Sequence, residues 1–436
     1  MAMHTNLTIE VSDNILKSYK PLRTASDLDP LLERIGDARF VLLGEASHGT
    51  HEYYTWRTAI SKRLIEEKGF SLIAVEGDWP DCYKINRWVK KYTDDGEKIS
   101  DVLKTFKRWP TWMWANWEVA ALAEWLRNHN EHLAPDKKAG FYGLDVYSLW
   151  ESMDLVVNYL DREDPEAAGL ARQAVNCFEP YDEEERAYIR ALDRSKEGCR
   201  EEVLKLLQEV RKKAPAYDED REAGLNAEVN ALVMANAEKY YRAMVSFADD
   251  SWNVRDRHMV ETLNTLMKFH GADTKVIVWE HNTHIGDARA TDMASQGLLN
   301  VGQLVREQQK KEDVVLVGLG SYQGEVMAGS AWGAPMQKML VPEARPDSVE
   351  EILHRNAPED KLLIFDQEQD DFFNQWLRHR AIGVVYHPER ERGNYVPTRL
   401  SARYDVFLFI DQTRALHPIY SQSDSAIVPD TYPFGL

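Results

Sequence analysis

Residues 40–57 read FVLLGEASHGTHEYYTWR, and the fold that we predict for the chain follows from this segment. Phe40 to Leu43 form a short apolar run of branched and aromatic residues, which is typical of a buried strand. Glu45 ends the run, and the pattern of a helix extends through Arg57. A strand that passes directly into a helix indicates a βαβ unit, in which the next strand runs parallel to the first.

Five further apolar runs in the chain end in a carboxylate. They are Leu72–Glu76, Phe141–Asp145, Lys275–Glu280, Leu362–Asp366 and Val406–Asp411. In an open parallel sheet, ligands bind at the carboxyl ends of the strands. We therefore expect the acids to gather at one edge of the sheet and to form a reaction centre with the histidines that follow the first and the fourth run, namely His48, His281 and His284.

The pattern of strands and helices divides the chain into two parts. Strand and helix patterns alternate in residues 1–148, and sheet patterns return in residues 271–436. These ranges predict one α/β core domain with a mixed, mostly parallel sheet flanked by helices. Residues 149–270 contain only patterns of amphipathic helices, and we predict a large helical insertion that forms one wall of a cleft. Gly320–Glu325 is predicted to be a glycine-rich turn, without the Lys-Ser/Thr ending of a phosphate loop.

The composition narrows the class of protein. The 436 residues, 44% of them hydrophobic, are enough for a sizeable core, and a formal net charge of −19 disfavours nucleic acid and acidic membranes as partners. No apolar run approaches the roughly 20 residues that span a bilayer, and the first residues lack the pattern of a signal peptide. Cys82, Cys177 and Cys199 are few and odd in number, which predicts no disulfide framework and a reducing, cytoplasmic location.

His48 lies three residues after Glu45, between Gly44 and Gly49, which are expected to let the backbone turn sharply. A histidine on such a strand-to-helix turn acts as a general base near neutral pH when a carboxylate fixes its tautomer. The plainer alternative is a histidine that only hydrogen-bonds the turn. The acids that are expected nearby favour the catalytic interpretation.

The neighbours of His48 are interpreted as structural. Ser47 or Thr50 is expected to cap the helix that follows, and His51 on that helix is expected to face solvent. Ser47 is not predicted to be a nucleophile, because the chain contains no Gly-x-Ser-x-Gly motif.

Further candidate residues lie at other strand ends and in a cluster of tryptophans. Glu76 is predicted to face the crevice at the sheet edge, whereas Asp78 is expected to cap the next helix. Asp145 and Arg255 are predicted to bind substrate or to support the site. Trp112 is predicted to line an apolar cleft for a bulky ligand.

His281 and His284 follow Glu280, and their spacing has two open interpretations. It fits a metal pair, with carboxylates from other strands completing the ligands. It also fits catalysis by positioned imidazoles, one of which polarises a carbonyl. Because no complete ligand signature is present, we expect no cofactor and no stoichiometric metal ion.

Several blocks of the sequence, taken together, resemble the erythromycin esterase family. They are Leu43–Thr50 with Arg57, Val75–Asp78, Tyr142–Asp145, Trp252–Asp256, Glu280–His284, and Ile382–Tyr386 followed by Asp411–Arg414. The resemblance implies an α/β-plus-helical fold with a cleft between its two parts, and hydrolysis of a macrolide lactone ester without a covalent acyl-enzyme. It implies that His48 is the base and that five residues support it: Glu45, Arg57, Glu76, His281 and His284.

These observations predict a carboxylic ester hydrolase whose partner is a small-molecule ester. In this interpretation His48 takes a proton from water, and Glu45 or Glu76 orients the imidazole of His48. His281 or Arg57 stabilises the oxyanion. Two alternatives stay open: a metal-dependent hydrolase of a phosphoester or a polysaccharide substituent, and a non-catalytic ligand-binding homologue.

Overall fold

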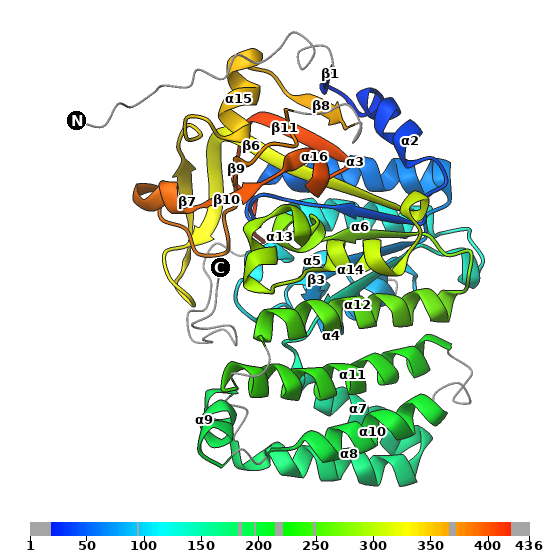
Figure 1. Ribbon diagram of the computed structural model, residues 1–436. Coiled ribbons are helices and arrows are strands. Elements are labelled where there is room, and N and C mark those ends of the chain that lie inside the picture. Colours follow the sequence, from blue (N-terminus) through cyan, green and yellow to red (C-terminus); the bar gives the residue numbers. More distant parts are fainter. Residues whose placement is uncertain are drawn as a thin grey trace.

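A nine-stranded sheet forms the centre of the computed structural model, which describes residues 19–93, 96–181, 185–195, 198–213, 221–246, 250–365 and 372–419 (Figure 1). In spatial order the strands are β1 (Tyr19–Pro21), β8 (Lys361–Ile364), β11 (Val406–Thr413), β6 (Val314–Gly329), β2 (Phe40–Leu43), β5 (Val276–Trp279), β3 (Leu72–Asp78) and β4 (Gly140–Asp145), and β7 (Met336–Val341) pairs with β6. A separate ribbon consists of β9 (Leu377–Arg380) and β10 (Tyr395–Thr398).

The six strands from β11 to β4 are all parallel to one another, whereas β1, β7 and β8 are antiparallel to the strands with which they pair. The predicted α/β fold with a mixed, mostly parallel sheet is therefore confirmed. The antiparallel direction of β8 corrects one expectation about the reaction centre. The carboxyl end of β8 lies at the opposite edge of the sheet from the other five predicted strand ends, and Asp366 itself lies outside the described residues.

The predicted turn at Gly320–Glu325 is wrong, because these residues lie inside the long strand β6. The glycines of β6 have a packing role. A Cβ atom on Gly318 would lie 2.7 Å from the ring of Tyr404, and one on Gly320 would lie 2.7 Å from the ring of Phe407. Glycine therefore makes room for aromatic rings on a buried strand, which a sequence pattern does not distinguish from a turn.

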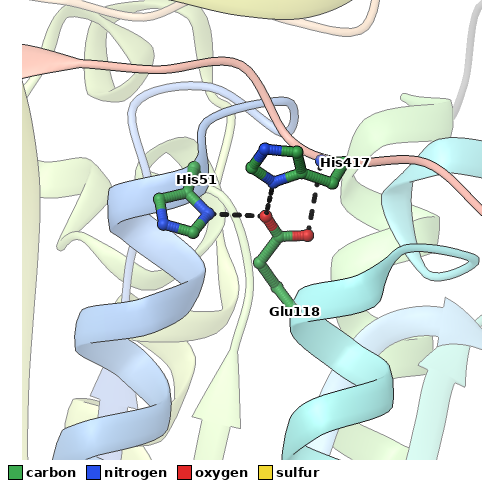
Figure 2. Close-up of side chains that lie close together, drawn as sticks. All are labelled: His51, Glu118 and His417. Atoms are coloured by element: carbon green, nitrogen blue, oxygen red, sulfur yellow. Dashed lines mark hydrogen bonds and ion pairs between the residues drawn. The ribbon is translucent and has the colours of Figure 1, made fainter.

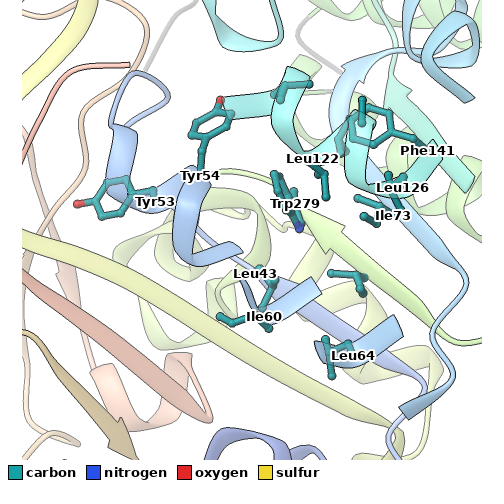
Figure 3. Packing of buried hydrophobic residues seen from close by; sticks show 14 of the residues in the cluster. Leu43, Tyr53, Tyr54, Ile60, Leu64, Ile73, Leu122, Leu126, Phe141 and Trp279 are labelled. Atoms are coloured by element: carbon teal, nitrogen blue, oxygen red, sulfur yellow. The ribbon is translucent and has the colours of Figure 1, made fainter. Parts of the chain in front are cut away.

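Helices cover both faces of the sheet (Figure 1). The first face is covered by α2 (Asp29–Ile35), α3 (His51–Lys68), α4 (Trp79–Val89), α5 (Ile99–Leu103) and α6 (Trp117–His129), and the second by α12 (Ser251–His270), α13 (Asn282–Ile285), α14 (Val301–Gln308), α15 (Val349–Asn356) and α16 (Leu400–Arg403). Alternate residues of a buried strand enter opposite cores. In β2, Val41 and Leu43 pack under the first set of helices, and Phe40 and Leu42 pack under the second. Figure 3 shows the first core around Trp279.

The described parts of residues 149–270 are helical or lie in the connections between helices. They contain α7 (Leu149–Glu163), α8 (Pro165–Phe178), α9 (Glu185–Ser195), α10 (Arg200–Lys213), α11 (Arg221–Met244) and α12. Helices α7 to α11 share an apolar cluster of their own, and α12 contacts both α11 and β4 (Figure 1). The division of the chain at residues 149 and 270 into core and insertion stays a prediction. In the described part of the chain, every helix is too short or too polar to cross a bilayer.

Cys177 and Cys199 form a disulfide bond between the end of α8 and the start of α10. The sequence predicted no disulfide framework, so this one disulfide was not expected, and Cys82 is free and buried. The physical reason is that α8 and α10 pack against each other, so that residues 22 positions apart in the chain meet. The number of cysteines therefore no longer supports the predicted cytoplasmic location.

Candidate functional site

The turn between β2 and α3 fits tightly between two other segments. A Cβ atom on Gly44 would lie 2.0 Å from Oδ1 of Asn282, and one on Gly49 would lie 1.8 Å from the backbone oxygen of Met327. Neither glycine has a positive φ. Glycine is therefore required at both positions because the neighbouring segments approach so closely. The sharp backbone turn that was expected is not the reason.

Ser47 and Thr50 share a short hydrogen bond between their hydroxyl groups, and both are buried. Thr50 occupies the cap position of α3, but its side chain accepts no hydrogen bond from the helix. The expectation that Ser47 or Thr50 caps α3 is therefore wrong, since the two hydroxyls bond to each other.

His48 is 8% exposed and lies on this turn, with Nδ1 2.9 Å from Oε1 of Glu45. An ionised carboxylate only accepts hydrogen bonds, so Nδ1 carries a proton and donates it. In the neutral ring this leaves Nε2 with a free lone pair, which is the state that a general base requires. Burial alone lowers the pKa of His48, but the negative charge of Glu76 and the hydrogen bond to Glu45 outweigh it and raise the pKa above the ordinary value of 6.5.

Arg57, two turns into α3, holds the other oxygen of Glu45. Its Nη2 donates to Oε2 of Glu45 at 2.6 Å, and its side chain is fully buried. The guanidinium lies over the rings of Tyr54 and Trp279, at 4.4 and 4.6 Å from their centroids. Arg57, Glu45 and His48 therefore form one buried chain of charged hydrogen bonds, in which Arg57 fixes the carboxylate that orients the imidazole.

Glu76 lies at the carboxyl end of β3, and its carboxylate accepts hydrogen bonds from two other residues. Its Oε2 accepts from the backbone N–H of His281 at 2.8 Å, and its Oε1 accepts from Nη2 of Arg255 at 2.7 Å. Burial raises the pKa of Glu76, but its interactions with His284, His48 and Arg255 outweigh burial and hold the pKa well below its usual range. Glu76 is therefore ionised, and it supplies a negative charge to the site.

Arg255 of α12 joins the sheet edge to the helical part. It forms two hydrogen bonds with Asp145, from Nε at 2.9 Å and from Nη2 at 2.7 Å, and its Nη1 lies 3.0 Å from Nε2 of His284. A guanidinium only donates, so Nε2 of His284 accepts and Nδ1 of His284 donates to Asp256 at 2.9 Å. His284 also lies 3.4 Å from Glu76, but the shorter contact fixes its tautomer. The contribution of Asp256 to this arrangement was not predicted from the sequence.

His281 lies beside His48, with 5.0 Å between the ring centroids. Its Nδ1 accepts from the backbone N–H of Thr283 at 3.2 Å, so the proton of the neutral ring is on Nε2. Among the described residues, Nε2 has no hydrogen-bond partner although it is buried. Burial, and then the nearby His48, lower the pKa of His281 well below 6.5. The residue is therefore a neutral imidazole whose N–H group lies at the reaction centre, close to the backbone carbonyl of Ala46.

These groups border a cavity of about 380 Å³ at the carboxyl edge of the sheet. Ten histidine, carboxylate and arginine residues line it: His48, Glu76, Asp78, Asp81, Arg108, Asp145, Arg255, His281, His284 and Asp292. Aromatic side chains also line the cavity: Phe106, Trp109, Trp114, Tyr147, Tyr240, Trp252, Trp332 and Tyr395. Tyr147 and Tyr240 belong to the apolar cluster of the helical part. A mostly apolar cavity with a few convergent polar groups is typical of a small-molecule site.

The predicted site residue Trp112 and the predicted helix cap Asp78 both lie elsewhere than expected. Trp112 is fully buried, does not line the cavity, and packs edge-to-face behind Trp109 with 5.3 Å between ring centroids, which corrects its predicted contact with the ligand. Asp78 lines the cavity, its carboxylate accepts from Nε of Arg108 at 2.8 Å, and it forms no cap hydrogen bond with α4. Asp78 is therefore a cavity residue, and Trp109 reaches the cavity whereas Trp112 does not.

Two acids that end predicted strands do not take part in the site. Asp411 of β11 binds His354 at 2.6 Å and does not line the cavity, because β6 lies between β11 and β2. Glu280 is fully buried with no hydrogen-bond partner for either oxygen among the described residues. Burial, reinforced by the charge of Glu76, raises the pKa of Glu280 well above its usual value. Glu280 is therefore a neutral acid behind the site.

Among the described residues, His281 and His284 do not form the metal pair that was one of the two interpretations of their spacing. Their ring nitrogens bind Thr283, Asp256 and Arg255 or face the cavity, and they belong to no group of three or more ligand atoms close enough to share an ion. The structure thus brings the two histidines to one cavity but gives them different partners.

Comparisons with known proteins identify the family. The family model described as Erythromycin esterase matches residues 65–413. Erythromycin esterase type II of Escherichia coli is 27% identical over 370 residues, which cover 77% of this chain and 85% of that protein. The putative hydrolase YbfO of Bacillus subtilis strain 168 is 22% identical over 321 residues, or 70% of this chain and 69% of that one.

A mutant of the erythromycin esterase EreC, solved in its open conformation, has the same fold, with a TM-score of 0.67, 15% identity, and coverage of 91% of this chain and 98% of that one. Glu45 and His48 precede the residues that the family model matches, and the hydrogen bond between them and the position of His48 on the cavity place them at the site. With its match over most of the chain, this protein belongs to the erythromycin esterase family, a family of hydrolases.

Proposed function

We propose that this protein hydrolyses a carboxylic ester with water activated by His48. The observation that carries the proposal is the juxtaposition of two histidines in complementary states on one cavity. His48 has its proton on the nitrogen that faces Glu45, and His281, at 5.0 Å between centroids, has its proton on the unpartnered nitrogen. One ring is thus set to accept a proton and the other to donate a hydrogen bond.

In the proposed mechanism, Nε2 of His48 takes a proton from water as the water attacks the ester carbonyl. Glu45 stabilises the imidazolium that forms, and Arg57 keeps Glu45 in place. This general-base assistance contributes on the order of 10²–10⁴-fold in rate. His48 later returns the proton to the leaving alcohol, so that the acid and the alcohol are the two products.

His281 is the proposed donor to the oxyanion. Its neutral N–H group forms no hydrogen bond of ordinary geometry with the described residues, whereas Arg57 is fully buried and every nitrogen of Arg255 already binds Asp145, Glu76 or His284. One such donor contributes on the order of 10²–10³-fold. Glu76 positions His281 by accepting its backbone N–H, and Arg255 with Asp145 ties the helical wall to the sheet edge.

The aromatic walls favour a bulky, largely apolar ester. A cavity of about 380 Å³ accommodates a substantial ligand, and tryptophan and tyrosine offer flat apolar surface with polar edges. The proposed substrate is a macrolide lactone or an ester of similar bulk, which agrees with the named activity of the relative from Escherichia coli.

The direct test is a panel of macrolides and simple aryl esters, followed by mass spectrometry for the gain of one water. We expect hydrolysis of at least one ester, and we expect the rate to survive treatment with a chelator because no step uses a metal ion. A phosphoester or an acylated polysaccharide in the same panel tests the metal-dependent alternative. Activity on that compound alone, lost with the chelator, would contradict the proposal.

The pH dependence of kcat/KM follows from the raised pKa of His48. Only neutral His48 accepts a proton, so kcat/KM falls as pH drops through this pKa, with a midpoint above 6.5. Because the hydrogen bond to Glu45 raises the pKa, Glu45→Gln should move the midpoint to lower pH. A midpoint that is unchanged in this variant would show that another group controls the acid limb.

A further inference from the structure

A second cluster of ionisable side chains lies outside the cavity, where the start of α3, the start of α6 and the segment after β11 meet (Figure 2). Nδ1 of His51 lies 2.5 Å from Oε1 of Glu118, and Nδ1 of His417 lies 2.7 Å from the same oxygen. His51 was expected to face solvent, but its side chain is only 19% exposed and binds Glu118. One carboxylate oxygen binds two imidazoles from distant parts of the chain.

We propose that His51, Glu118 and His417 bind a Zn²⁺ ion. The candidate ligand atoms of the three residues all lie within 4.8 Å of one another. Two histidines and a glutamate are a ligand set that zinc accepts, with bonds of roughly 2.0–2.2 Å. Tetrahedral ligands at such bond lengths are about 3.3 Å apart, so the carboxylate has to withdraw from each ring by less than ~1 Å.

The backbone already fixes the three segments that carry the ligands. The N–H of His51 donates to the oxygen of Arg414 at 2.8 Å, and the N–H of Trp117 donates to the oxygen of His417 at 2.9 Å. The ligands are thus preorganised before an ion arrives, which lowers the entropic cost of binding. The side chain of His417 is 60% exposed, so an ion and its water have access from solvent.

The electrostatics of the cluster favour a cation. Glu118 is buried, and one oxygen of its carboxylate lies between the two imidazoles. The carboxylate is thus placed as the anionic ligand of the set, and the net charge of −19 attracts cations to the protein. A site with two imidazoles selects zinc and its neighbours in the first transition row over magnesium and calcium, which prefer oxygen.

The bound ion would join the end of the described chain to the turn that carries His48. The N–H of Leu416 donates to the oxygen of Gly49 at 3.0 Å, so the segment that carries His417 lies against this turn. The role that we assign to zinc is to hold this segment in place. The proposal revises the expectation of a metal-free chain, and it does not depend on the proposed ester hydrolysis, in which the ion takes no part.

The test is a calorimetric titration of the tag-free, chelator-treated full chain with Zn²⁺, and separately with Mg²⁺. We expect one Zn²⁺ per chain, a rise in Tm on binding, and no binding of Mg²⁺. His417→Asn removes an exposed ligand, and Glu118→Gln removes the charge with little change in shape. Each should weaken the affinity for Zn²⁺ by about 100-fold or more, because altering a group that only supports a metal ligand already weakens it about 10–100-fold.

Two control variants test whether Zn²⁺ binds at other histidines instead. His132→Asn alters an exposed histidine elsewhere, and His281→Asn alters the reaction centre; both should bind Zn²⁺ like the unaltered chain. Circular dichroism confirms the fold of each variant, and the visible absorbance of Co²⁺ gives a second readout of tetrahedral binding. The proposal is overturned if the unaltered chain binds no Zn²⁺, if folded His417→Asn binds it equally well, or if His281→Asn is the variant that loses it.

Discussion

His48→Asn should lower kcat/KM on any ester that the protein hydrolyses by about 10²–10⁴-fold, the range attributed to a general base. Asparagine keeps a polar side chain beside Glu45 but does not accept a proton near neutral pH. Because the substitution fits the same turn, Tm should change little. Steady-state kinetics and thermal unfolding of the same preparation give both numbers.

Ser47→Ala is the matched control for His48→Asn. Ser47 is adjacent in the chain, equally buried, and bonded only to the hydroxyl of Thr50. Its loss should leave most of the rate, because it takes no part in proton transfer. If Ser47→Ala is inactive while His48→Asn keeps most of its rate, the proposed roles of the two residues are reversed.

Arg57→Met should destabilise the protein by about 3–5 kcal/mol, which is the usual cost of leaving one charge of a buried pair without its partner. The guanidinium is fully buried, and it binds Glu45 and two aromatic rings. Methionine keeps the packing volume but leaves the carboxylate of Glu45 unpaired. Urea unfolding, analysed by linear extrapolation, measures the loss.

Arg63→Met is the control for Arg57→Met on the same helix. Arg63 pairs with Glu67 and Asp29, both of which are largely exposed, and such surface pairs contribute little. Glu45→Gln in the Arg57→Met background should recover part of the lost stability, because it removes the unpaired charge. Equal losses of unfolding free energy for Arg57→Met and Arg63→Met would show that the buried ion pair stabilises the protein no more than a surface pair does.

The sequence was sufficient to predict the strands that carry the site. All six apolar runs form strands, and those that end near Glu45, Glu76, Asp145 and Glu280 are parallel neighbours, β2, β3, β4 and β5. Their apolar character on both faces is what a buried parallel strand requires. The order and the direction of the strands are not contained in this pattern. For this reason the sequence did not exclude Asp411, which β6 separates from the site, or reveal that β8 runs the other way.

Other features depend on contacts between distant parts of the chain. Trp112 and Trp109 have the same local pattern, and only packing decides that Trp109 faces the cavity. The cluster of Glu118 with His51 and His417 joins residues 67 and 299 positions apart, and no local motif indicates it. Asp256 had a weak signal, because it follows Arg255 at the start of a helix and lies in a block that resembles the family.

The most direct test of histidine-activated water is intact-protein mass spectrometry of the chain, quenched during turnover of an ester in H₂¹⁸O. The proposed mechanism predicts a protein of unchanged mass at every time point and a product acid that contains one atom of ¹⁸O from the solvent. A chain that is heavier by the acyl group, with the adduct on Ser47 or another side chain, would contradict direct attack by water.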